Sequence, residues 1–204
     1  MFTSRTGLVL GFHGTDRSVV DDVINGRADL VARHNKYDWL GHGIYFWDNS
    51  YSRALDWATE LSKRPDSHIK EPAVVGAILE LGNCLDLPDY QNIDFLKEGY
   101  KLLQNSAVDS NANIPVNRGK TEDLLQRELD CAVIEALHEY MKEDGTPAYD
   151  SVRSVFWEGA EIYPTAGFRE KNHIQVCIRS LDCIKEYFLP LPRVTSYSNA
   201  PSSF

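Results

Sequence analysis

The segment GHGIYFWDNSYSRALDWA, residues 41–58, joins a short aromatic run to an amphipathic stretch. The run at 44–47 is aromatic and β-branched, and it favours a short strand. The residues that follow, at 50–63, place alanine and leucine side chains at helical spacing, which predicts a helix. Trp57 lies on that helix. The segment therefore predicts a strand followed by a helix, with aromatic side chains on both.

A second short motif, GFHGT at 11–15, ends an earlier apolar run. His13 offers an imidazole, and Gly14 lets a flat ligand approach the main-chain N–H and C=O groups. Tyr45 and Trp57 offer flat apolar faces for stacking. Together these groups suit a carboxamide-bearing ring such as nicotinamide.

The remaining elements mix strands and helices irregularly. Further strands are expected at 7–13, 73–81, 151–157 and 173–179, and further helices after Asp16, at 89–105 and at 122–142. Residues 106–121 are loop-like, and we expect one domain at 1–193 followed by a flexible tail at 194–204. Because strands and helices do not alternate regularly along the sequence, their order favours an α+β fold over a doubly wound parallel sheet.

Composition narrows the class of protein. Hydrophobic residues make up 43% of the 204 residues and charged residues 25%, which excludes a wholly disordered chain. The formal net charge of −9 disfavours a general nucleic-acid coat protein, which needs a basic face for phosphates. The sequence has neither an apolar run near the roughly 20 residues of a membrane span nor a signal-peptide layout, so we expect a cytoplasmic protein without a membrane partner. The four cysteines form no C-x-x-C pair and have no histidine at metal-ligand spacing, which predicts reduced thiols and no metal site.

The motifs H-G-T at 13–15 and G-x-G-I-Y-F at 41–46 resemble the first two motifs of the ADP-ribosyltransferase superfamily. The similarity is to its diphtheria-toxin-like and PARP-like branch, whose signature is a His-Tyr-Glu triad, and within that branch to small bacterial proteins. It covers residues 7–60 well and 170–180 weakly. The resemblance implies an α+β ADP-ribosyltransferase-like fold, with a split mixed sheet, an NAD cleft and peripheral helices. NAD would be the co-substrate.

The resemblance also implies roles for single residues. His13 would hydrogen-bond the nicotinamide-side ribose of NAD, Gly14 would bind the carboxamide through its main chain, and Tyr45 would stack on the ring. We expect His13 and Tyr45 to face one cleft. Trp57 stands, with a shift of one residue, where the family has its second stacking aromatic residue. The residues expected to contact NAD are His13, Gly14, Thr15, Gly43, Tyr45, Phe46 and Trp57.

The third motif of the family, a glutamate at the start of a late strand, is altered in this chain. Gln175, flanked by Ile174 and Val176, aligns with that glutamate and is expected on a strand beside that of Tyr45. Glutamine keeps the hydrogen bonding but lacks the charge that stabilises a cationic sugar. Glu170, in the preceding loop, is either a substitute carboxylate or a solvated loop residue. The expected catalytic set is His13, Tyr45, Gln175 and Glu170.

The resemblance implies NAD-dependent transfer of a single ADP-ribose to a macromolecular acceptor, with release of nicotinamide. The acidic charge favours protein over nucleic acid as the acceptor. The resemblance to bacterial toxins implies a toxin or phage-defence role, with an antitoxin as a partner. Three alternatives stay open: a module that binds NAD or ADP-ribose without turnover, an NAD glycohydrolase, and a structural or partner-binding protein that keeps only the fold.

Overall fold

A mixed β-sheet organises the part of the chain that the structure, a computed structural model, describes, residues 7–191. Its seven strands lie in the order β4-β5-β6-β2-β1-β3-β7, with β4 and β5 parallel and all other pairs antiparallel. The strands are β1 (Val9–Asp16), β2 (Ile44–Asp48), β3 (Pro72–Leu79), β4 (Cys84–Asp86), β5 (Ser151–Phe156), β6 (His173–Ile178) and β7 (Ile184–Phe188). The expected α+β class is confirmed, and the tail expected at 194–204 lies outside the described residues.

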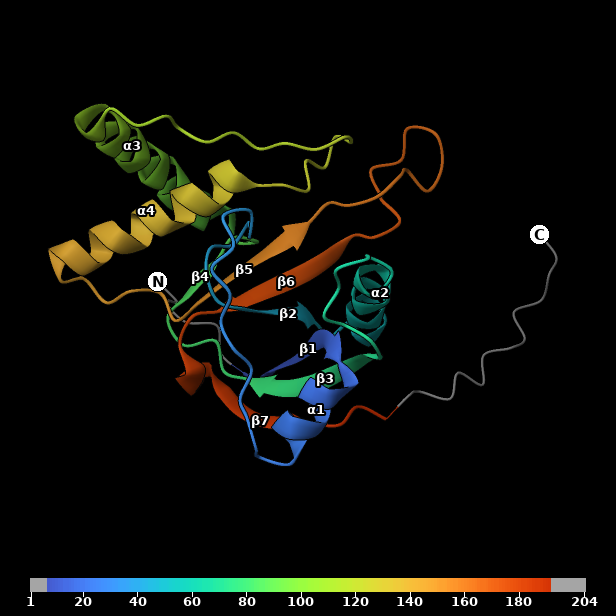
Figure 1. The fold of residues 1–204 in the computed structure, drawn as a ribbon. Coiled ribbons are helices and arrows are strands. Elements are labelled where there is room, and N and C mark those ends of the chain that lie inside the picture. The colour runs from blue at the N-terminus through green and yellow to red at the C-terminus, as the bar shows by residue number, and fades with distance from the viewer. Residues whose placement is uncertain (1–6, 192–204) are drawn as a thin grey trace.

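Helices flank this sheet on both faces. Within residues 7–191 they are α1 (Arg17–Ile24), α2 (Tyr51–Ser62), α3 (Ile93–Ser110), α4 (Glu128–Asp144) and the short 3₁₀ helices η1 (Tyr90–Asn92) and η2 (Leu181–Cys183). Figure 1 shows α3 and α4 together at the β4–β5 end of the sheet, and α1 and α2 at the end that holds β1 and β3. Asp16 caps α1, since its carboxylate accepts the Ser18 N–H group at 3.0 Å. None of the helices in this range is long and apolar enough to cross a membrane.

The core forms on both faces because successive residues of a strand point to opposite sides of a sheet. In β3, Val75 packs with Val20 of α1 and with Phe46 in what we call the α1 cluster. Its neighbour Val74 packs with Ala54 of α2 in the α2 cluster. A third group, the α4 cluster, contains Leu40, Leu85, Leu87, Ile134, Leu137, Met141, Val152 and Cys177.

The structure corrects the start of the helix expected at 122–142, since α4 begins at Glu128. Leu124 has a φ of 44°, in the left-handed region that a helix cannot contain. Arg118 and Gln126 also pair as an isolated antiparallel bridge, which engages the main chain just before α4. Backbone pairing with a neighbouring loop has overridden the apolar spacing of this segment.

Other differences follow from weak local signals. α3 continues to Ser110, into the segment expected to be a loop, and ends where Asn111 adopts a φ of 51°. The strands β4 and β7 were not expected. β4 has only three residues, and β7 has no fully buried side chain, so neither shows the apolar alternation by which strands are recognised.

Gly43→Ala is expected to destabilise the fold, because β2 approaches β6 closely at this residue. A Cβ atom there would lie 2.4 Å from the Ile178 carbonyl oxygen and 2.6 Å from the Cys177 sulfur. Overpacking of this kind costs about 1–3 kcal/mol, so the urea midpoint of unfolding should fall. Gly167→Ala is the control, since nothing lies within 4 Å of its Cβ position. Equal midpoints for the two variants would contradict the prediction.

Candidate functional site

The strands β1 and β2 pair over two residues only and then separate. Gly11 lies opposite Asp48, and Phe12 lies opposite Trp47. In contrast, β1 pairs with β3 along its whole length of 8 residues. The backbone pairing of β1 with β2 therefore ends before His13, and we call this unpaired stretch the β1–β2 split.

Main-chain groups of β1 point into the β1–β2 split. The Asn49 N–H group donates to the Leu10 carbonyl oxygen at 2.8 Å, so the polar groups of Leu10 face β2. Because these groups alternate in direction along a strand, those of Gly14 also face β2, beyond the last paired residue. The helix α2 lies directly against Gly14, where a Cβ atom would be 2.1 Å from the Ala54 carbonyl oxygen. Only glycine fits there, and it presents an N–H and a C=O group to the split.

His13 supplies a hydrogen bond where the strand pairing stops. Its Nδ1–H group donates to the Tyr45 carbonyl oxygen at 2.7 Å, because a carbonyl oxygen only accepts. Burial outweighs this hydrogen bond and lowers the pKa of His13 to about 4, so the ring is neutral near pH 7. Its Nε2 atom then carries a lone pair and has no hydrogen-bond partner among residues 7–191. That atom is an acceptor for a hydroxyl group.

The side chain of Tyr45 lies on the other face of β2 from that of His13. Its hydroxyl donates to the Gly41 carbonyl oxygen and accepts from the Leu40 N–H group, both at 2.8 Å. Its ring packs against the α4 cluster, whereas the His13 ring meets the edge of Phe46 in the α1 cluster. The expectation that both side chains face one cleft is therefore not met. The two residues meet through the Tyr45 carbonyl group.

Gln175 lies on β6, directly opposite Trp47, and alternation puts it on the face that carries the Tyr45 side chain. Its carboxamide oxygen accepts the Trp39 Nε1–H group at 2.7 Å. Val176 points to the other face, where it is buried in the α1 cluster. The expected placement of Gln175 on the strand beside that of Tyr45 is confirmed. Its carboxamide N–H₂ group is left as a donor.

Trp57 shares the surroundings of Gln175, whereas Glu170 does not. The Trp57 ring, on α2, is half-buried and lies 5.5 Å from the ring of Trp47. Glu170 is exposed in the loop between β5 and β6. It therefore adds no buried charge to the face that Gln175 occupies.

Three residues that were expected to contact NAD lie at buried or tightly packed positions instead. Phe46 is fully buried in the α1 cluster, where it cannot touch a ligand, so its expected contact is corrected. Thr15 is buried as well. Gly43 is required by the close approach of β2 to β6, as its Cβ position shows.

A buried polar group that the sequence did not reveal lies between α2 and β6. It consists of Trp47, Arg53, Glu158 and His173, and we call it the His173 cluster. Arg53 Nη2 donates to both carboxylate oxygens of Glu158, at 2.7 and 2.8 Å. Arg53 and Trp57 are four residues apart, which puts both on one face of α2. This spacing is the feature of the sequence that could have indicated the cluster. Nothing local identifies Glu158 as the partner, since 105 positions separate it from Arg53.

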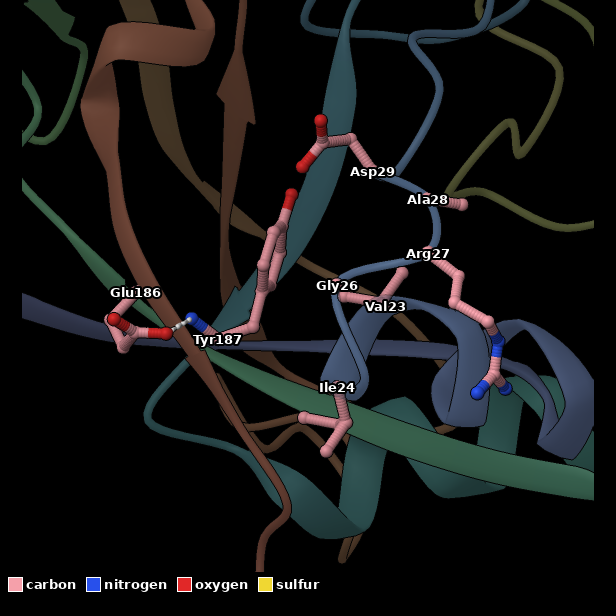
Figure 2. Close-up of a pocket in the computed structure, with 8 residues that line it drawn as sticks. All are labelled: Val23, Ile24, Gly26, Arg27, Ala28, Asp29, Glu186 and Tyr187. Carbon is pink, nitrogen blue, oxygen red and sulfur yellow. Dashed lines mark hydrogen bonds between the residues drawn. The ribbon is translucent and has the colours of Figure 1, made fainter.

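Two cavities in the described residues lie away from the β1–β2 split. One, of about 310 Å³, lies between α1 and β7, and there Figure 2 shows the Tyr187 hydroxyl directed toward Asp29. The other, of about 360 Å³, lies beside α4. Neither is lined by His13, Tyr45 or Gln175.

Comparisons of the chain with protein-family models, with curated proteins and with solved structures found no match.

We expect the fold to lose stability as the pH falls from about 6.5 to 4. Burial lowers the pKa of both His13 and His173 from the ordinary 6.5 to about 4. Between these values the unfolded chain binds more protons than the folded chain, so the free energy of unfolding decreases with falling pH. Each histidine contributes up to about 3 kcal/mol to this loss. Urea unfolding at several pH values measures it.

The control for this pH dependence is His34→Gln, since His34 is exposed. That variant should keep the slope of the original chain, whereas His13→Gln should flatten it. A free energy of unfolding that stays constant from neutral pH to pH 4.5 would contradict the prediction.

Proposed function

We propose that this chain transfers one ADP-ribose group from NAD to a macromolecular acceptor and releases nicotinamide. The observation that carries the proposal is the β1–β2 split, into which Gly14 directs a main-chain N–H and a C=O group. A primary carboxamide has the complementary pair, a C=O acceptor and an N–H donor, and continues the pairing where β2 turns away. Nicotinamide carries such a carboxamide on a flat ring.

One side chain extends this arrangement to the ribose. The free Nε2 atom of neutral His13 accepts a hydrogen bond from a ribose hydroxyl group. The Tyr45 ring packs against the α4 cluster on the other face of β2, and its hydroxyl is held by the 40–41 main chain, so the expected stacking of Tyr45 is not part of this proposal.

The reaction is a substitution at the anomeric carbon of the ribose. The bond to the nicotinamide nitrogen breaks, its electron pair leaves with nicotinamide, and the acceptor bonds to the carbon through an oxocarbenium-like state. Gln175, whose oxygen is held by Trp39, orients a ribose hydroxyl with its N–H₂ group. It carries no charge to stabilise the cation, so catalysis rests mainly on positioning. We therefore propose transfer of a single group without chain elongation.

The neutral side chain at 175 also favours a second candidate, a module that binds NAD or ADP-ribose without turnover. Glu158, a half-buried carboxylate on the same side of the sheet, is already paired with Arg53. A site without a free carboxylate holds the ligand but stabilises the cationic state weakly. In that case NAD binds, and neither nicotinamide release nor transfer follows.

The purified chain is expected to bind NAD and to transfer label from adenosine-labelled NAD to macromolecules of a cell lysate, with equal release of nicotinamide. His13→Ala should weaken NAD affinity about tenfold, because a ribose hydroxyl loses its acceptor. His34→Ala, an exposed residue, is the control and should bind as the original chain does. Calorimetry that finds no NAD binding by the folded chain would overturn the proposal, and binding without release would support the second candidate.

Gln175→Glu is expected to raise the transfer rate at least about tenfold, because a carboxylate stabilises the oxocarbenium-like state. The Trp39 N–H group keeps an acceptor in this variant. Gln175→Ala should lower kcat far more than it changes NAD affinity. If single-turnover rates are the same for both variants and the original chain, Gln175 has no part in the mechanism.

A further inference from the structure

The backbone of Arg33 lies on the edge of β2 that faces β1. Its N–H group donates to the Gly43 carbonyl oxygen, and its carbonyl oxygen accepts the Gly43 N–H group, both at 3.1 Å. Main-chain groups alternate in direction along a strand, so those of Gly43 and Tyr45 face the same side. Because the Tyr45 carbonyl oxygen accepts from His13 of β1, Arg33 lies on the β1 side of β2, next to the β1–β2 split.

The side chain of Arg33 reaches from this edge toward the end of β1. Its Nη2 atom lies 3.0 Å from Nε2 of His68, in the loop between α2 and β3. That loop is fixed to the last residue of β1, since the Lys70 and Glu71 N–H groups donate to the Asp16 carboxylate at 2.6 and 2.9 Å. The contact between Arg33 and His68 therefore joins the start of β2 to the end of β1, beyond the last paired residues of the two strands.

The guanidinium of Arg33 forms no ion pair with a carboxylate of residues 7–191. Because a guanidinium only donates, His68 Nε2 accepts its hydrogen bond, and the His68 ring is neutral. The half-buried Asp38 carboxylate lies within range of the charge of Arg33, but it accepts from the Asn35 side chain at 3.0 Å. Arg33 and His68 are both exposed, so an anion reaches the remaining N–H donors of Arg33 without displacing packed side chains.

The charge of Arg33 acts at the position that the proposed function gives to the ribose. Burial and, to a smaller extent, the charge of Arg33 lower the pKa of His13 to about 4, so the guanidinium lies within electrostatic range of that ring. His13 Nε2 is the proposed acceptor for a hydroxyl of the nicotinamide-side ribose, and the 5′ carbon of that ribose carries the pyrophosphate of NAD. A guanidinium suits such a group, because its planar N–H donors match phosphate oxygens in pairs.

We propose that Arg33, held in place by His68, binds the pyrophosphate of NAD and makes the site specific for nicotinamide nucleotides over nicotinamide riboside. This inference rests on the proposed function, because it takes the ribose to lie at His13. Arg33 is then a binding residue, and His68 is a positioning residue that acts through it. Arg33 supplies the positive charge that the main-chain groups of Gly14 and the neutral ring of His13 do not provide.

The test compares three ligands of the purified full chain: NAD, nicotinamide mononucleotide and nicotinamide riboside, each in competition with labelled NAD. NAD should bind at least about tenfold more tightly than the riboside. Arg33→Gln should weaken binding of NAD and of the mononucleotide about tenfold and leave the riboside unchanged, because only the first two lose charge-assisted hydrogen bonds. Arg33→Lys keeps the charge without the planar fork and should restore part of the lost affinity.

Salt dependence provides a second readout. Salt screens interactions between exposed charges, so raising the salt concentration from about 0.05 M to about 0.5 M should weaken NAD binding by the original chain more than by Arg33→Gln. His68→Ala should weaken NAD binding less than Arg33→Gln does, because the guanidinium keeps its charge and loses only the contact that orients it.

Arg118→Gln is the matched control. Arg118 is also exposed, and its main chain likewise forms an isolated antiparallel bridge, with Gln126. It belongs to the loop before α4, whereas Arg33 belongs to the segment before β2. The control variant should bind all three ligands as the original chain does, and thermal unfolding establishes that every variant is folded.

The outcomes separate this inference from the proposed function. If Arg33→Gln binds NAD as the original chain does, the role of Arg33 is overturned and the proposed function stands. Equal losses for NAD and the riboside in that variant, or an equal loss of NAD affinity in Arg118→Gln, also overturn it, because the effect then does not come from the phosphates.

Inorganic pyrophosphate distinguishes NAD from another anion. If Arg33→Gln loses affinity for inorganic pyrophosphate but keeps its affinity for NAD, Arg33 binds a different anion and the inference is overturned. A folded original chain that binds neither NAD nor nicotinamide riboside overturns both the inference and the proposed function.

Discussion

The early end of the pairing between β1 and β2 is the constraint on which the rest of the structure depends. With a continuous ladder, Gly14 and Tyr45 would satisfy each other's main-chain groups, and the sheet would offer no polar backbone to a ligand. His13 takes the Tyr45 carbonyl oxygen instead. One such hydrogen bond contributes only about 0.5–1.5 kcal/mol net, so exchanging a main-chain partner for a side-chain partner costs little. Because β1 stays paired with β3 along its whole length, the early end of its pairing with β2 does not weaken the β1–β3 ladder.

Charge is arranged around this opening so that the groups facing it stay neutral. Buried or half-buried ion pairs join the elements around β2: Arg53–Glu158, Arg153–Asp48 and Arg179–Glu135. Such pairs add little net stability, but removing one partner is strongly destabilising, so they fix α2 to the end of β5, β5 to β2, and β6 to α4. The groups on the strands beside β2 are uncharged: the main-chain groups and neutral imidazole of His13 on β1, and the neutral imidazole of His173 and the Gln175 carboxamide on β6. These groups suit the carboxamide and hydroxyl groups of a nicotinamide nucleotide better than its phosphates.

Local patterns predicted the elements that build the opening, and long-range contacts explain what they missed. The strands that became β1, β2, β3 and β6 and the helix α2 were recognisable from apolar spacing, and the placement of Gln175 followed from strand alternation. The contact of His13 with the Tyr45 carbonyl was not predictable, because residue types do not reveal where a ladder stops. The same holds for Arg53 and Glu158, whose pairing depends on how α2 crosses the sheet. Phe46 was wrongly expected to contact NAD, because an aromatic residue in a strand gives the same sequence pattern whether its side chain faces the core or a ligand.

The helix α2 joins the two parts of the candidate site through neighbouring residues. Ala54 places its carbonyl oxygen where a Cβ atom on residue 14 would be, so α2 sets the backbone at the split. Arg53, one position earlier, holds Glu158 and thereby the His173 cluster. Any shift of α2 along the sheet therefore moves the main-chain groups of Gly14 and the His173 cluster together. A helix that is packed at Ala54 and ion-paired at Arg53 keeps both in fixed relation, as the proposed reaction, which depends on positioning, requires.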